Sequence, residues 1–323
     1  MKNNTYYPKQ EFYDYDSMQE STKIWDQVCT YPMALNGYQG EHEFLYLNNI
    51  LLSHTYRSGA LYYDVIPPSD FISIGLVIKC DGKACFGEFK LKEDDIVFFD
   101  SIQNFLVNAE IKIDIISIPK IYLRKLNLLN QFNSYIHKKM IDKENLLSQK
   151  VIEAFQFFRD TKNSSVDFDY TKTEENIITI LLDLCRQQTA KQEKFTPGEK
   201  VVLEIIHDLY KHLHKDINIS YLTNSYNIQE RTLQKSFKSL FGLSPNYFIR
   251  TLKLNYTHKE LKQAMSRETT VIKIAKKWGF SNMGRFSAYY RELFGETPSS
   301  TLSRIPAANK NLENFCIITE EEF

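Results

Sequence analysis

Short apolar runs separated by turn residues fill the chain from residue 44 to residue 118. The runs are rich in Val, Ile, Phe and Tyr, a composition that predicts β-strands. The breaks between them are clusters of turn residues, namely Asn48-Asn49, Ser58-Gly59, Pro67-Pro68, Asp81-Gly82 and Glu93-Asp94-Asp95. The predicted strands are residues 44–47, 51–57, 60–65, 72–79, 84–89, 96–99, 105–109 and 112–118. Eight strands at regular spacing indicate a barrel or a sandwich.

From residue 119 onward the apolar positions recur at three- and four-residue steps, as in Val151, Phe155 and Phe158. This period predicts helices over residues 121–132, 143–159 and 174–187, with a loop over residues 160–169. The third helix is apolar around much of its circumference. Such a helix needs partners on more than one side, so we expect it to lie in the core or at a dimer interface. Before the strands, residues 21–31 fit a short helix.

A polar segment, residues 187–195, separates these helices from a second helical region. Thr196-Pro197, with Glu199 after it, is a typical helix start and predicts a helix over residues 197–214. We therefore expect an N-terminal domain over residues 1–190 and a C-terminal domain over residues 191–305. Residues 306–323 form an acidic tail that is most simply disordered.

One apolar pattern is written twice between residues 219 and 299. Leu222, Asn227 and Ile228 return 52 residues later as Ile274, Gly279 and Phe280. A second group returns 53 residues later: Leu233, Phe237, Phe241, Gly242, Ser244 and Pro245 correspond to Phe286, Tyr290, Phe294, Gly295, Thr297 and Pro298. The second turn therefore carries one extra residue. Each copy predicts two helices joined by a turn. In the second copy we expect positive φ at Gly279 and an N-cap at Ser281.

The second helix of each copy has apolar residues at i, i+4 and i+8, which buries one stripe of the helix. Gly242 and Gly295 end these helices, and Ser-Pro and Thr-Pro pairs begin the next ones. The opposite face carries side chains that can bond base edges and phosphates. The candidate DNA-binding residues are Arg231, Thr232, Gln234, Lys235 and Lys238 in the first copy, and Met283, Arg285, Ser287 and Arg291 in the second.

Charge is divided unevenly along a chain that has 40 basic and 40 acidic residues. Residues 215–304 contain fifteen Lys or Arg against six Asp or Glu, and the remainder contains 25 against 34. A basic module attached to an acidic one is typical of a nucleic-acid-binding domain with a separate regulatory domain. An ordinary solvated helix surface would explain the charge but not the repeat.

The most specific part of the repeat reads Ile-Ala-x-x-x-Gly-Phe-Ser-x-x-x-x-Phe, from Ile274 to Phe286, followed by Phe-Gly-x-Thr-Pro ending at Pro298. This stretch resembles the DNA-binding domain of AraC-type transcriptional regulators. The resemblance covers about 90 of the 323 residues. Residues 229–237 and the sequence Lys-Lys-Trp-Gly-Phe ending at Phe280 are also similar to regulators of ethanolamine utilisation, a match that assigns no effector.

The resemblance implies two recognition helices about one turn of DNA apart, roughly 34 Å, that enter successive major grooves. The helix over residues 245–265 would set their separation. Family members usually have Gly at Asn227 and a capping Ser at Gln229, so the first turn is less typical. Gly284 and Ala288 fall where longer polar residues often touch bases. We therefore expect the first helix to read more of the sequence than the second.

The fold class that follows is α+β: an N-terminal β-rich, cupin-like barrel plus helices, and a C-terminal all-α domain with two helix-turn-helix units. The cupin-like barrel is what the resemblance implies for residues 44–118, and in the family it often holds an effector. A metal-dependent cupin enzyme is the alternative, but His42 lacks a second His two residues on and His54 has no carboxylate at suitable spacing. We expect no metal, cofactor or catalytic residue.

Five cysteines, Cys29, Cys80, Cys85, Cys185 and Cys316, show no zinc-site spacing. Cys80 and Cys85 flank the predicted hairpin at Asp81-Gly82, which could bring them close enough for a redox switch. We expect two ordinary strand cysteines instead. With no apolar run of membrane-spanning length, we expect a cytoplasmic protein that does not contact membranes.

The sequence therefore predicts a sequence-specific transcriptional regulator, an activator by resemblance. Its expected partners are double-stranded promoter DNA and RNA polymerase, with a small-molecule effector and a homodimer left open. Besides the enzyme, a regulator controlled only by a protein partner or by oligomerisation stays open.

Overall fold

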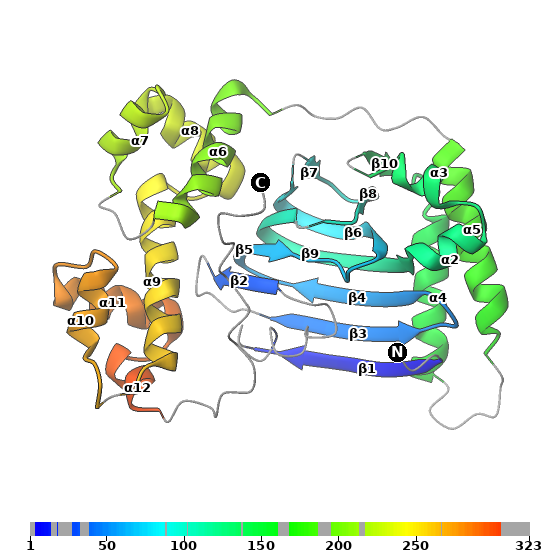
Figure 1. The fold of residues 1–323 in the computed structure, drawn as a ribbon, viewed down its shortest axis with the longest axis horizontal. Helices are drawn as coiled ribbons and strands as arrows, with labels where there is room; N and C mark the ends of the chain where they lie inside the picture. The colour runs from blue at the N-terminus through cyan, green and yellow to red at the C-terminus, as the bar shows by residue number, and fades with distance from the viewer. Residues whose placement is uncertain are drawn as a thin grey trace.

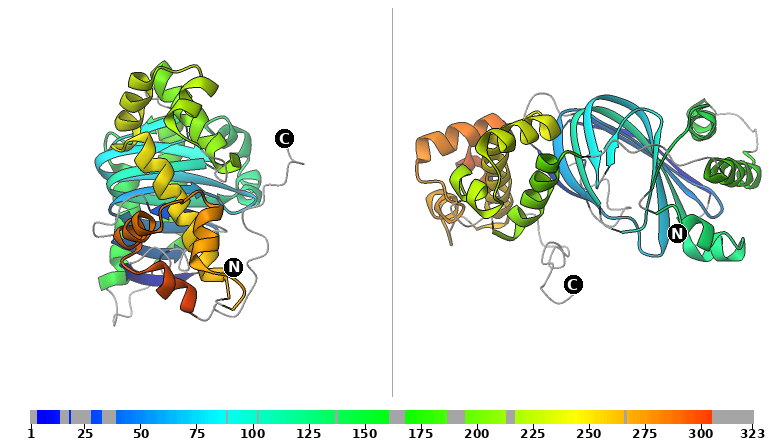
Figure 2. Two further views of the ribbon diagram at one scale, coloured as in Figure 1. Left: turned by 90° about the vertical axis from the view of Figure 1, so that its left-hand side faces the viewer. Right: turned by 90° about the horizontal axis from the view of Figure 1, so that it is seen from above.

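The computed structural model describes residues 4–13, 18, 28–32, 39–87, 89–101, 103–136, 138–160, 168–186, 195–212, 217–265 and 267–304. A curved antiparallel sheet occupies the middle of the molecule, with helices of the N-terminal domain on one side and the helical C-terminal domain on the other (Figure 1). The view from above shows the same three-part arrangement (Figure 2, right). The predicted α+β class, with a β-rich N-terminal and an all-α C-terminal domain, is confirmed.

The sheet has the order β1-β3-β4-β9-β6-β8-β10, with β5 pairing both β9 and β2 and β7 pairing β6. Its strands are β1 (Thr5–Phe12), β2 (Val28–Pro32), β3 (Gly40–Tyr46), β4 (Leu51–Arg57), β5 (Ala60–Val65), β6 (Phe71–Phe86), β7 (Phe89–Leu91), β8 (Asp95–Phe99), β9 (Gln103–Pro119) and β10 (Lys139–Ile141). Two of the expected strands, residues 51–57 and 60–65, match β4 and β5 in both bounds. Strands β1, β2 and β10 were not predicted, and the expected helix over residues 21–31 is wrong for residues 28–31, which belong to β2. Residues 21–27 lie outside the described residues.

The expected hairpin at Asp81-Gly82 is wrong, because β6 runs through it as one strand of 16 residues. The predicted strands over residues 105–109 and 112–118 are likewise parts of one strand, β9. The two long strands pair with each other from Phe71↔Pro119 to Phe86↔Phe105. Asp81 and Gly82 therefore face Glu110 and Ala109 across the ladder. Turn residues in one strand are tolerated here because the partner strand satisfies their backbone hydrogen bonds.

Cys80 and Cys85 consequently lie on one strand, not on two facing strands. An odd separation along a strand sends their side chains to opposite faces of the sheet. Cys80 is half-buried and Cys85 is buried, and burial raises the pKa of the Cys85 thiol to about 12. Both are free thiols in the structure.

Four helices, α2 (Lys120–Lys125), α3 (Leu129–Asn133), α4 (Leu146–Asp160) and α5 (Tyr170–Arg186), follow the sheet in the N-terminal domain. The single helix expected over residues 121–132 is interrupted where Asn127 has φ 57°. Helix α5 buries Ile177 and Leu181 in the same apolar cluster as Leu52 and Ile116 of the sheet. Of the two roles left open for this helix, the structure shows core burial.

A polar layer lies between the sheet and α4. Glu43, fully buried, accepts hydrogen bonds from Arg159 and from the Tyr6 hydroxyl. His54 Nδ1 lies 2.5 Å from Asp114 Oδ1 on β9, so the expectation that His54 has no carboxylate partner is wrong. Strand pairing, not sequence spacing, brings these two residues together. Among the described residues, no group of three or more His, Cys, Asp or Glu is placed to hold a metal ion.

The C-terminal domain consists of α6 (Pro197–His212), α7 (Ile219–Ser225), α8 (Glu230–Phe241), α9 (Pro245–Gln263), α10 (Val271–Lys277), α11 (Met283–Phe294) and α12 (Pro298–Ser303). The predicted start of α6 is confirmed: Thr196 Oγ1 accepts from the Glu199 N–H, and Glu199 Oε2 accepts from the Thr196 N–H. No described helix is both long and apolar enough to cross a membrane. Residues 187–194 of the expected linker, residue 305 and the expected tail over residues 306–323 lie outside the described residues.

Candidate nucleic-acid interface

The first helix-turn-helix unit is formed by α7 and α8. Asn218 caps α7, and its side chain accepts from the Tyr221 N–H. Asn227 takes the left-handed conformation in the turn, with φ 47°, as a residue at the usual glycine position must. Gln229 is the N-cap of α8 but makes no side-chain capping bond. Gly242 ends α8 with φ 70°. Ser244 is the N-cap of α9, which begins at Pro245.

The second unit, α10 and α11, repeats this plan with a longer turn. Four residues separate α7 from α8 and five separate α10 from α11, as the sequence repeat predicts. Gly279 has φ 84°, which confirms the expected left-handed turn residue. The expected N-cap at Ser281 is wrong, since Asn282 caps α11 and accepts from the Arg285 N–H at 3.0 Å. The extra residue in the turn moves the cap by one position.

In the first unit, three of the predicted DNA-binding side chains project from one side of α8. Arg231, Lys235 and Lys238 are exposed and spaced i, i+4, i+7, so they share a face of the helix. Gln234 is half-buried. Thr232 is exposed but lies against the first turn of α6, because a Cβ at Gly198 would come within 2.8 Å of its methyl group. The assignment of all five to DNA contacts stays a prediction.

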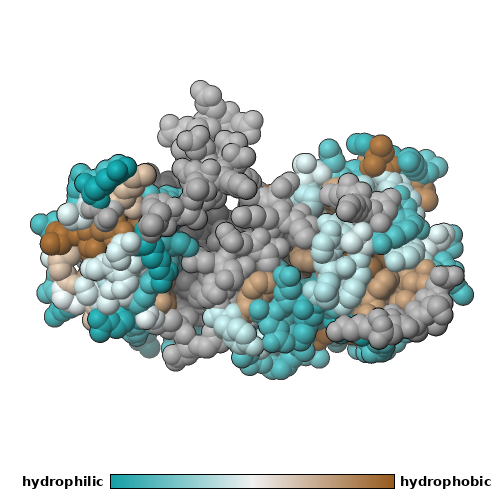
Figure 3. All heavy atoms as spheres, turned by 90° about the horizontal axis from the view of Figure 1, so that it is seen from below, coloured by the Kyte–Doolittle hydropathy of each residue, from teal (hydrophilic) through white to brown (hydrophobic). Residues whose placement is uncertain are grey.

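In the second unit, Arg285 and Arg291 are exposed on α11, whereas Met283 and Ser287 are half-buried. Gly284 and Ala288 are also exposed, but neither carries a long polar side chain. Seen from below, the surface of the C-terminal domain is largely hydrophilic, interrupted by a hydrophobic patch (Figure 3). The second unit therefore offers two cations but few groups that could read bases.

The basic side chains of both faces are available to phosphates. Within the described part of the chain, Arg231, Lys235, Lys238, Arg285 and Arg291 form no ion pair with an acidic side chain. In contrast, Lys277 at the end of α10 is paired with Glu260 at 2.9 Å. Unpaired cations on an exposed face gain most from meeting the DNA backbone, because phosphate contacts release condensed counterions.

Helix α9 joins the two units and packs against both. At its N-terminal end Phe248 lies 5.7 Å from Phe237 and 5.0 Å from Phe241 of α8, measured between ring centroids. At its C-terminal end Glu260 accepts a 2.8 Å hydrogen bond from Trp278 Nε1. Tyr256 packs on the same indole with centroids 5.0 Å apart. The spacing of the units is thus set by side chains at both ends of one helix.

Further contacts join α9 to α11 and α12. The Arg250 guanidinium lies 3.9 Å from the centroid of the Tyr289 ring. His258 Nδ1 lies 2.6 Å from the buried Tyr290 hydroxyl, which also donates to Thr301 Oγ1 at 2.8 Å. The His258 ring stacks on Phe294 at 4.1 Å. Sequence reasoning missed these positioning residues, because contacts between residues this far apart in sequence leave no periodic pattern.

The first unit also contacts the N-terminal domain. Asn108 Nδ2 on β9 donates to the Phe241 carbonyl at 2.6 Å, at the C-terminal end of α8. Lys83 Nζ on β6 donates to the Lys238 carbonyl at 3.1 Å. Cys85 and Leu106 lie in the same apolar cluster as the core of the first unit. Gly242 is required at the helix end, because its φ is positive and a Cβ there would come within 2.1 Å of Asn108 Nδ2.

A partly buried ion pair supports this contact. Lys90 Nζ on β7 lies 3.1 Å from Glu199 Oε2, and Ser239 of α8 donates to Glu199 Oε1 at 2.7 Å. Burial alone would raise the pKa of the Glu199 carboxyl, but the Thr196 N–H, the Ser239 hydroxyl and Lys90 hold it below its ordinary value. The carboxylate thus stays charged and joins α6, α8 and strand β7.

Comparison with known proteins bears on the C-terminal helices. A family model described as a helix-turn-helix domain matches residues 222–304, which span both units. The chain is 28% identical over 98 residues to a probable thc operon regulatory protein of Rhodococcus erythropolis, covering 30% of each chain. It is 28% identical over 126 residues to a XylDLEGF operon transcriptional activator of Pseudomonas putida, covering 39% of each. Residues 222–304 form an AraC-type helix-turn-helix domain.

The matches stop short of whole proteins. The chain spans about a third of the length of these two relatives, and 44% of the transcriptional activator RhaS of Pectobacterium carotovorum, to which it is 27% identical over 128 residues. Among solved structures, the AraC-like transcriptional activator CuxR aligns with 78% of this chain and 96% of its own, at 12% identity and a TM-score of 0.43. A probable AraC family regulator from Rhodopseudomonas palustris aligns with 32% of this chain and 94% of its own, at 35% identity and a TM-score of 0.30.

Proposed function

We propose that this protein is a sequence-specific transcriptional regulator that binds promoter DNA and activates transcription. The observation that carries the proposal is the pair of helix-turn-helix units joined by α9, each with exposed, unpaired basic residues on its second helix. Two recognition helices fixed to one rigid helix can enter successive major grooves about 34 Å apart. The operon activators among its relatives support activation rather than repression.

The two units have unequal roles in this proposal. Helix α8 reads bases through Arg231, Gln234 and Lys235, and α11 contributes mainly phosphate contacts through Arg285 and Arg291. The exposed Gly284 and Ala288 of α11 carry no side-chain group that can form a hydrogen bond with a base edge. RNA polymerase is the partner that activation requires, and the cytoplasm is where the protein would meet it.

The N-terminal domain, proposed as residues 1–190, would receive an effector and pass its presence to the AraC-type domain. Strands β6 and β9 form a wall with two faces: Phe86 and Phe105 line a cavity inside the barrel, and their neighbours Cys85 and Leu106 pack on the first helix-turn-helix unit. A ligand that moves the inner residues would move the outer ones. Such a shift works only through different affinity for two states of the protein.

Selection of binding sites from a random DNA pool by the full chain tests the DNA-binding function. The expected result is two conserved base clusters, about one helical turn apart, with more information in the cluster read by α8. A single cluster would remove the role of the second unit. Enrichment of no sequence above bulk DNA would overturn the proposal.

A further inference from the structure

The curved sheet of the N-terminal domain lines a cavity whose walls are almost entirely apolar. Side chains from both halves of the sheet line it, among them Phe44, Val77, Phe86, Phe99, Phe105 and Ile113. Its volume of ≈ 60 Å³ is several times the ~10–15 Å³ that one water molecule needs. The cavity therefore has room for several water-sized groups before any side chain moves.

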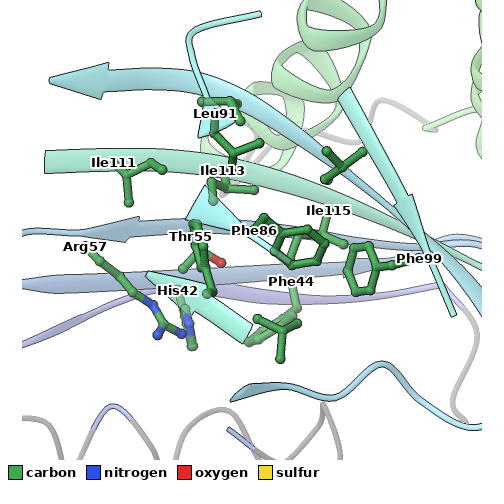
Figure 4. Close-up of a pocket in the computed structure, with 15 residues that line it drawn as sticks. His42, Phe44, Thr55, Arg57, Phe86, Leu91, Phe99, Ile111, Ile113 and Ile115 are labelled. Carbon is green, nitrogen blue, oxygen red and sulfur yellow. The ribbon is translucent and has the colours of Figure 1, made fainter. Parts of the chain in front are cut away.

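One end of this cavity is polar. His42, Thr55 and Arg57 come from the neighbouring strands β3 and β4, and Figure 4 shows Arg57 and His42 beside one another, away from Phe99. Alternation along β4 explains their position, since Thr55 and Arg57 point inward whereas His54, the residue before Thr55, packs against Phe155 of α4. Arg57 is 4% exposed and His42 3% exposed. Among the described residues that line the cavity, none is acidic.

The polar end carries positive charge that does not depend on ordinary changes in pH. Burial, helped by Arg57 and His54, holds the pKa of His42 well below its usual range, so this imidazole is neutral near pH 7. An arginine side chain presents a charged, planar guanidinium with five N–H donors and no acceptor. A planar guanidinium next to a neutral imidazole suits a carboxylate, which accepts two parallel N–H bonds from Arg.

We propose that this cavity binds a small organic acid, with its carboxylate against Arg57 and a short apolar body among the aromatic side chains. The inference rests on the proposed role of the N-terminal domain as the receiver of an effector, and names the chemical class of that effector. A sugar would leave most of its hydroxyls unpaired against apolar walls. An ammonium compound such as ethanolamine would place its charge beside that of Arg57.

Ligand binding by the full chain, measured by calorimetry without DNA, tests the proposal directly. The probes are straight-chain carboxylates from acetate to octanoate and benzoate, with butanamide and butylammonium as size-matched neutral and cationic controls. The expected affinity rises with the apolar length of the acid until the cavity is full and then levels off or falls. The neutral and cationic controls are expected to bind at least about tenfold more weakly.

Two variants address the two ends of the cavity. Arg57→Met is expected to weaken acid binding about tenfold or more, with Arg57→Lys closer to the wild type because it keeps the charge. At the apolar end, Gly75→Ala adds a methyl group whose nearest neighbours, Val97, Phe99 and Ile113, stand 3.4–3.9 Å away. The fold has room for that methyl, so the variant is expected to weaken the longer acids selectively. Thermal unfolding without ligand confirms that each variant is folded.

The outcomes separate this inference from the proposed function. Acid binding that is lost in Arg57→Met and length-selective in Gly75→Ala supports the inference, whatever the DNA measurements give. Absence of binding by every acid, or equal binding of butanamide or butylammonium, overturns it. The site selection described above can succeed in that case, and the DNA-binding function then stands with a different effector.

Discussion

At the residue scale, the side chains of α8 that can meet DNA lie on a different side of the helix from those that pack against the rest of the protein. Arg231, Lys235 and Lys238 are exposed on one side, whereas Ser236 is buried and Ser239 bonds Glu199 on another. Thr232 shares the side that faces α6, near Gly198. The apolar period of the sequence separates core from surface, but it does not divide the surface between DNA and a neighbouring helix, so Thr232 was grouped with the DNA-facing residues.

The roles of Arg231 and Lys238 can be told apart by substitution. Arg231→Ala is expected to cost about 1–3 kcal/mol on the selected site and to relax the preference at one base position. Lys238→Ala is expected to weaken specific and random DNA alike and to lower the salt slope by about 1, because a phosphate contact carries no sequence information. Competition binding at several salt concentrations measures both. Equal losses on specific and random DNA for Arg231→Ala would refute its assignment to a base.

The start of α8 offers a second prediction. Gln229 is in the N-cap conformation, with φ −65° and ψ 139°, but its side chain makes no capping bond. Gln229→Ser places a short hydroxyl where it can accept from an unpaired N–H of the first turn, and should stabilise the first unit by about 0.5–1 kcal/mol. Hydrogen exchange of the amides of the C-terminal domain, measured at increasing urea concentrations, gives the gain in stability. The control is Asn282→Ala on α11, where an existing cap is lost and stability should fall; a destabilised Gln229→Ser would contradict the assignment of the cap.

At the element scale, the helices of the C-terminal domain were more predictable than the strands of the N-terminal domain. A helix carries its signals locally, in a 3.6-residue apolar period, a capping residue and a terminal glycine. Helix α11 shows all three, α8 has the period and the glycine, and α9 has the Ser244 cap. A strand depends on a partner that lies far away in sequence. The Asp81-Gly82 pair resembles a hairpin turn, yet the pairing of β6 with β9 keeps it inside a strand.

The link between α9 and the second unit predicts a measurable role for one hydroxyl. Tyr290 is fully buried, and its hydroxyl joins His258 of α9 to Thr301 of α12. Tyr290→Phe keeps the ring but leaves buried polar groups without that bridge, which should destabilise the second unit by about 1–3 kcal/mol. Hydrogen exchange of the amides of α11 and α12 measures the loss.

The neighbouring tyrosine provides the control for this prediction. Tyr289 packs its ring against Arg250, and Tyr289→Phe keeps that ring. Exchange in this variant should stay close to the wild type. Equal exchange in the two variants would show that the Tyr290 hydroxyl does not hold the units at their separation.

At the scale of the whole molecule, the contact between the domains could not be predicted from the sequence. Asn108 and Lys83 are polar residues on strands, and nothing in their spacing distinguishes a solvated strand face from one that meets a helix. Cys85 and Leu106 lie on the outer face of their strands, where the alternating pattern would allow contact with solvent. In the structure the first helix-turn-helix unit covers them. The polar segment and the Thr-Pro helix start predict a domain boundary, whereas the surface that the domains share depends on three-dimensional packing.

The domain contact gives the last prediction. Asn108 donates a 2.6 Å hydrogen bond to the Phe241 carbonyl, one of the carbonyls that the end of α8 leaves without a helical partner. Asn108→Ala removes this donor and should cost about 1–3 kcal/mol of the interaction between the domains. Faster hydrogen exchange is then expected both at the end of α8 and in the paired ends of β6 and β9. Glu110→Ala, two residues along the same strand and exposed, is the matched control and should leave exchange in α8 unchanged. If the barrel passes its state to the AraC-type domain through this wall, Asn108→Ala must also change DNA affinity, whereas unchanged affinity with faster exchange would place the communication elsewhere.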